Sequence, residues 1–161
     1  MKKINSERGQ SLVELSISLM VLLWLLAGAV EFGLGFFQFI QLRDAAQEGA
    51  LYGSINPADT SGMIDRVKAQ STSPIDLAAQ YTSGAISGIQ PGEVRVETSY
   101  VKDDGTIGTG CITEGIEVTV AYSHKFFIPL ATLFSSGNTI TIKASVTDTI
   151  LTKDPLITPC P

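Results

Sequence analysis

Few side chains in this 161-residue chain could do chemistry. His124 is the only histidine, and there is no Cys-x-x-Cys spacing, phosphate-binding loop or nucleophile elbow. Asp103 and Asp104 offer two carboxylates, whereas a calcium site needs about six or more oxygen ligands. We expect Asp103-Asp104-Gly105 to form a turn and His124 to lie at the surface or at a strand edge. The sequence therefore predicts no enzyme, no metal, no cofactor and no small-molecule substrate.

A carboxylate near the start of a long apolar run is more informative. From Leu12 to Leu42 the only charged side chains are Glu14 and Glu31. About twenty apolar residues cross a bilayer core of about 30 Å, so the run predicts a membrane helix. An ionisable group inside such a helix is costly and usually has a specific partner, which makes Glu14 a candidate functional residue.

Composition leaves three interpretations of residues 1–30. The segment could be an uncleaved anchor, or a secretory signal peptide cut at Ala27-Gly28-Ala29. It could also be a short leader cut after Gly9, which retains the apolar helix. The third is favoured because it makes Gln10 the new N-terminus, one helical turn from Glu14. It is also favoured because apolar residues continue well beyond Ala29.

Residues 8–53 resemble the TadE-like family, which comprises minor pilins or pseudopilins of tight-adherence (Flp-type) pili within the type IV filament superfamily. Three pieces in order carry the resemblance: Arg8-Gly9-Gln10-Ser11-Leu12-Val13-Glu14, Val30-Glu31-Phe32-Gly33 and Ala45-Ala46-Gln47-Glu48-Gly49-Ala50. Two residues depart from the family pattern. Leu15 stands where pilins often have Phe or Tyr, and Leu34 replaces a common basic residue.

The resemblance implies cleavage between Gly9 and Gln10 by a prepilin peptidase. It also implies that Glu14 aligns a subunit with the N-terminus of its neighbour during assembly. The implied partners are other pilins, pilus-assembly platform proteins and membrane lipid. The departure at Leu15 leaves open whether this chain is processed.

Glu31 lies 17 residues after Glu14, or about 25 Å along a helix, close to the outer boundary of a bilayer. Four phenylalanines would lie in or near the interface: Phe32, Phe36, Phe37 and Phe39. Two interpretations of Glu31 remain: an interfacial carboxylate that reaches water, or a polar contact with the membrane helix of another pilus component.

Charge predicts the orientation of the chain. Lys2, Lys3 and Arg8 oppose only Glu7 before the apolar run, which predicts a cytoplasmic N-terminus and an extracytoplasmic C-terminal domain. From Arg43 onward 8 basic and 13 acidic residues give a net charge of −5, which argues against nucleic acid as a partner. In an oxidising compartment Cys111 and Cys160 are expected to form a disulfide, the alternative being two unpaired thiols.

The pattern after the apolar run predicts an α+β domain. The helix is expected over residues 11–54, with Gly49 and Gly53 on a face of small residues that lies on the domain's own sheet. Asn56-Pro57 ends it, and one or two short helices are expected next, one over 61–68 and the other opened by Ser73-Pro74. Alternation predicts antiparallel strands at 93–101, 116–123 and 140–147. The apolar segment 126–134 is either core or an exposed patch.

The predicted architecture is a long N-terminal helix, half in the membrane and half in the domain, packed on a small antiparallel sheet of three or four strands, as in pilins. Its parts are a leader (1–9), a transmembrane and assembly helix (10–38) and an extracytoplasmic domain (39–161). The predicted function is a minor pilin, pseudopilin or assembly component in the inner membrane or the pilus. The alternative is a single-pass anchored binding module that never joins a filament.

Overall fold

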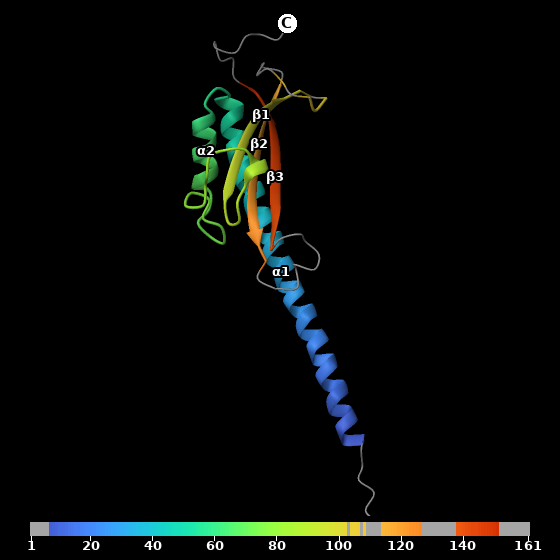
Figure 1. Cartoon of the computed structure of the whole chain (residues 1–161). Coiled ribbons are helices and arrows are strands. Elements are labelled where there is room, and N and C mark those ends of the chain that lie inside the picture. The colour runs from blue at the N-terminus through green and yellow to red at the C-terminus, as the bar shows by residue number, and fades with distance from the viewer. Residues whose placement is uncertain (1–6, 103, 107, 109–113, 127–137, 152–161) are drawn as a thin grey trace, which may run out of the picture.

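A computed structural model describes residues 7–102, 104–106, 108, 114–126 and 138–151. Its longest element is a single N-terminal helix against which the rest of the described chain is packed (Figure 1). Helix α1 (Glu7–Ile55) has 49 residues and is about 70 Å long. Its first half projects alone, and its second half lies against a small domain. The predicted helix over 11–54 is confirmed.

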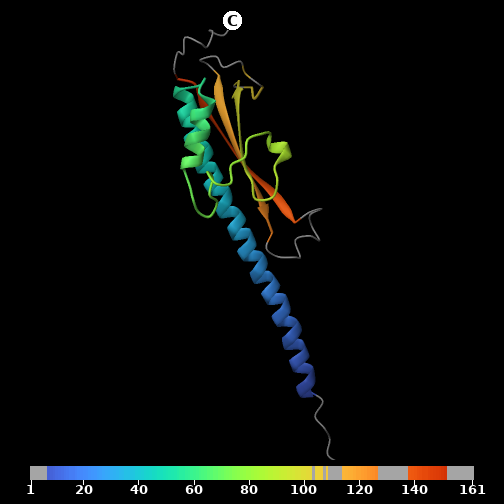
Figure 2. The same ribbon diagram turned by 60° about the vertical axis from the view of Figure 1, so that its left-hand side comes forward.

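The domain is a three-stranded antiparallel sheet covered on one face by helices (Figure 2). Strands β1 (Val94–Val101), β2 (Gly115–Lys125) and β3 (Thr139–Thr149) follow one another in space in chain order. Val96 pairs with Val120, and Val118 pairs with Val146. Helix α2 (Thr60–Ala69) packs beside α1, and a single 3-10 turn, η1 (Ile86–Gly88), precedes β1. The α+β prediction is confirmed.

Small residues let α1 approach its neighbours closely. Ala45, Ala46 and Ala50 are fully buried in the core cluster. A Cβ added to Gly49 would lie 2.8 Å from Val67 Cγ2 and 3.2 Å from Val118 Cγ1. A Cβ on Gly53 would lie 3.0 Å from the sulfur of Met63 and 3.1 Å from Ile116 Cγ1. The predicted seam of small residues is therefore present, and it contacts α2 as well as the sheet.

Hydrogen bonds fix the start of α2 to α1. The Asp59 carboxylate caps α2 by accepting from the Gly62 amide at 2.9 Å, and it also accepts from the Tyr52 hydroxyl at 2.8 Å. The hydrogen bonds from Gly62, Ser61 and Tyr52, in that order, hold the pKa of Asp59 below its ordinary value. The cap therefore favours the ionised carboxylate and links the two helices.

The predicted second short helix at Ser73-Pro74 is wrong. Residues 71–80 form a loop with turns, in which the Gln41 side chain takes both backbone groups of Ile75. Gln41 Nε2 donates to the Ile75 carbonyl at 2.6 Å, and the Ile75 amide donates to Gln41 Oε1 at 3.2 Å. A partner in α1 thus replaces the local hydrogen bonds that a helix would need.

The close approach at Gly49 gives a stability test. Gly49→Val should lower the free energy of unfolding by about 1–3 kcal/mol, because the added carbons meet Val67 and Val118 in a packed core. Gly33→Val is the matched control, since nothing lies within 4 Å of a Cβ there. Thermal unfolding of the detergent-solubilised protein compares them, and equal stability of both variants would contradict the packing described here.

Candidate functional site

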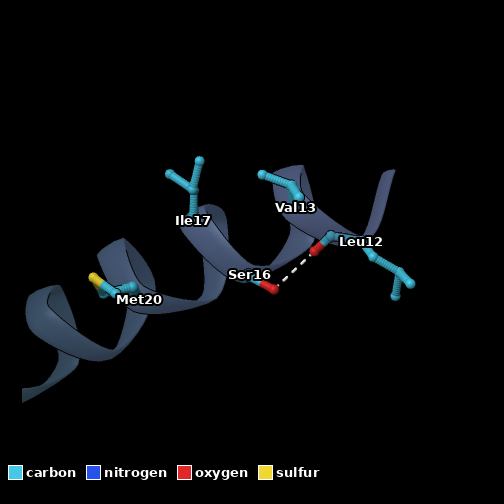
Figure 3. Close-up of a pocket in the computed structure, with 5 residues that line it drawn as sticks. All are labelled: Leu12, Val13, Ser16, Ile17 and Met20. Atoms are coloured by element: carbon cyan, nitrogen blue, oxygen red, sulfur yellow. Dashed lines mark hydrogen bonds between the residues drawn. The ribbon is translucent and has the colours of Figure 1, made fainter. Parts of the chain in front are cut away.

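The first three turns of α1 hold the predicted cleavage residues, Gly9 and Gln10, and one predicted assembly residue, Glu14. Gln10 and Glu14 are both helical and exposed, four residues apart and so on the same face. Leu12, Val13, Ser16, Ile17 and Met20 line a shallow hollow beside them (Figure 3). All five come from α1 alone, so this hollow is a groove between side-chain ridges on one helix. Such grooves receive the side chains of a second helix.

The next stretch of α1 is apolar on every side. Leu15, Leu19, Leu22 and Leu25 and the residues between them are largely exposed, as is Trp24. By length and composition α1 could cross a membrane. A helix that is hydrophobic all round needs a hydrophobic environment all round, which the domain does not give to this half.

The predicted site residue Glu31 has a partner that the sequence prediction missed. His124 Nε2 lies 2.9 Å from Glu31 Oε1, and the two side chains are 9% and 12% exposed. His124 was expected at the surface or a strand edge, and the expectation of surface exposure is wrong because the residue is 7% exposed. Of the two interpretations of Glu31, neither included this contact within the chain.

The alternation of residues in β2 already indicated that His124 faces the helices. Ile116, Val118 and Val120 face the helices. The same alternation, continued by every second residue, places Tyr122 and His124 on that face as well. The His124 ring also meets the ring of Phe126 edge-on, with centroids 5.7 Å apart. An imidazole buried on the helix-facing side of β2, near the end of that strand, needs a polar partner, and Glu31 of α1 supplies it.

Polar side chains continue up the helix from this pair. Gln38 and Gln41 are both buried between α1 and the domain, and Gln41 holds the Ile75 backbone. The lower end of the contact between α1 and the domain thus carries hydrogen bonds from Glu31 and Gln41, whereas the upper end, from Leu42 to Gly53, is packed by apolar and small residues. Sequence periodicity did not reveal this division, because both halves share one helical spacing.

The structure does not bring the predicted site residues together. Glu14 and Glu31 are separated by 17 helical positions, or about 25 Å. Glu31 contacts the domain, and Glu14 is exposed on the projecting half. Cys111, Cys160 and residues 127–134 lie outside the described residues, so the disulfide and the role of that apolar segment stay predictions.

Comparison with known proteins agrees with the N-terminal half. Residues 9–51 match the family model described as TadE-like protein. The resemblance seen in the sequence is thereby confirmed over this segment, which includes Gly9, Glu14 and Glu31. Searches of curated proteins and of solved structures find no match. The match supports a pilus-associated protein with an apolar N-terminal helix that could anchor in a membrane.

A double-mutant cycle measures the contact between Glu31 and His124. Each single change, Glu31→Ala or His124→Ala, should cost about 1–3 kcal/mol of stability, because it leaves a buried polar group without its partner. The double variant should cost less than the sum of the two. Chemical unfolding in detergent gives the four free energies, and strict additivity would show that the pair is not coupled.

Proposed function

We propose that this chain is a minor pilin or pseudopilin of a tight-adherence pilus that acts structurally through α1. The observation that carries the proposal is one unbroken helix that matches the TadE-like model over residues 9–51 and is apolar on all sides for its first half. Its second half is built into the domain. A filament of packed helices needs such a subunit: a rigid helix with a free apolar half and an attached head.

The proposed cycle begins in the inner membrane, with the N-terminus in the cytoplasm and the domain outside. A prepilin peptidase cuts between Gly9 and Gln10, and the apolar half of α1 then leaves the lipid to pack against equivalent helices. Lipid and helix neighbours are both apolar, so the exchange conserves the burial of Leu15 and its neighbours. TadE-like pilus proteins are structural rather than enzymatic, which agrees with the sequence.

Glu14 favours the move of α1 from lipid into the filament. A carboxylate in hydrocarbon is unfavourable by about 3 kcal/mol on insertion scales for acidic residues, so a cationic partner is strongly preferred there. The new ammonium at Gln10 of a neighbouring subunit would supply one, and so would the same chain's own N-terminus one turn away. When a subunit is added, Glu14 exchanges the N-terminus of its own chain for the N-terminus of the neighbouring subunit. The new contact sets the axial offset between the two helices.

Processing is tested by the mass of the mature protein. Cleavage should yield a chain that begins at Gln10, and Gly9→Val should leave the full-length chain, because the added side chain crowds the residue before the scissile bond. Mass spectrometry of the membrane fraction reads both. A wild-type chain that begins at Met1 would favour the uncleaved anchor, and one that begins at Val30 would favour a secreted domain.

The role of Glu14 is tested separately by incorporation. Glu14→Ala should insert into the membrane normally but enter sheared pili about tenfold less or worse, since about 1.4 kcal/mol of lost pairing in hydrocarbon gives that ratio. Ser18→Ala, one turn further along the same exposed helix, is the control. Immunoblots of pilus and membrane fractions measure the ratio, and normal incorporation of the Glu14 variant would exclude the assembly role.

A further inference from the structure

The lower end of the domain carries an exposed surface that the fold does not explain. Phe32 and Phe36 on α1 are 77% and 57% exposed, and their rings stack with centroids 6.5 Å apart. Ile140, at the start of β3, is 50% exposed and pairs with His124, which bonds to Glu31. These side chains therefore lie at the same height along α1, at the end of the domain nearest the projecting half.

The height of this surface matches a bilayer boundary. Leu12 to Val30 is 19 residues, or about 28 Å of helix, close to a hydrocarbon core of about 30 Å. Phe32 and Phe36 follow by about 3 to 9 Å, and the headgroup layer on each side is about 5 to 8 Å thick. At this height the Phe32 and Phe36 rings would lie at the boundary between the hydrocarbon core and the headgroups.

Charge at the same end has the sign that phospholipid requires. Lys125 ends β2, pairs with Thr139 at the start of β3 and is exposed. The two nearby carboxylates each have a partner: Glu31 bonds to His124, and Glu93 pairs with Arg95 at 2.9 Å. Lys125 therefore places a positive charge at the end of the net acidic domain that faces the projecting half of α1.

We propose that Phe32, Phe36, Ile140 and Lys125 form a seat that rests in the anionic headgroup layer of the outer leaflet. The surface is continuous with the apolar half of α1, so the occupant is lipid before assembly rather than a second protein. The Glu31–His124 contact holds the helix and the sheet end at one height, so that both enter the headgroups together. The seat thereby fixes how deep α1 lies and, through the sheet, how the domain stands on the membrane.

This inference rests on the membrane anchoring in the proposed function but not on cleavage or pilus entry, so its test uses the purified full chain in vesicles. Trp24→Phe removes the only tryptophan. In that background Phe36→Trp is the probe, and Leu51→Trp, also half exposed but 15 residues further along α1, is the control. Lipids labelled with a quencher at the headgroup, or shallow or deep in the acyl chain, report depth.

The Phe36→Trp emission should be quenched most by headgroup and shallow labels, while Leu51→Trp is quenched by none. Lys125→Gln should abolish the stronger quenching expected in phosphatidylglycerol vesicles than in phosphatidylcholine vesicles, whereas Lys102→Gln, exposed after β1, should not. An unquenched Phe36→Trp would overturn the proposal. Quenching that disappears as protein density in the vesicles rises would also overturn it, by showing that a second copy covers the face. Equal quenching in both lipids would overturn the role of Lys125.

Discussion

The close approach of α1 to the sheet is the contact on which the rest of the structure depends. A three-stranded sheet with one covered face cannot stand alone, and here a single helix provides most of the cover. Gly49 and Gly53 each lower helix propensity by about 1 kcal/mol relative to alanine, and they are tolerated because side chains of α2 and β2 fill the space above them. The buried cluster extends from Leu42 to Ile150, so the end of the described chain is joined to the same helix. The Leu151 amide completes this by donating to the Ser54 carbonyl at 2.8 Å.

Apolar packing alone would leave the helix free to slide or rotate on the sheet, and the polar contacts at its lower end oppose this. The Glu31–His124 contact and the two hydrogen bonds between Gln41 and Ile75 each require one relative position of the two groups. A slip by one turn would leave several buried polar groups unpaired, at about 1–3 kcal/mol for each. Small apolar residues of α1 therefore supply the buried area, and hydrogen-bonded residues nearer the projecting half fix the position of α1 along the domain.

Sequence patterns were sufficient where one physical rule dominates. Alternation placed all three strands, and the spacing of small residues placed the contact face of α1, because burial on one side imposes a period on both elements. The patterns failed where distant groups meet. The Ser73-Pro74 segment carries good local helix-start signals, but Gln41, 34 residues away, competes for its backbone. His124 has an inward position that the strand period could have revealed, yet no local rule names Glu31 as its partner. For Glu14 and Gly9, the proposed chemistry involves a neighbouring subunit and a peptidase, and the two cysteines lie outside the described residues.

The two acidic residues of the apolar run differ in whether the described domain provides a polar partner for the carboxylate. Glu31 lies where α1 first meets the domain, and the fold gives it an imidazole and excludes most of the water around both groups. Glu14 lies about 25 Å away by helical rise, on a half of the helix that contacts none of the described residues of the domain. A group that is costly in lipid and remote from the domain is satisfied best by an incoming charge at the same depth. A helix terminus has a positive charge fixed at one position, whereas a basic side chain would add a second cost in hydrocarbon. Cleavage after Gly9 would create that terminus without adding any side chain, which is why the two candidate features, the glycine and the glutamate, make chemical sense only as a pair.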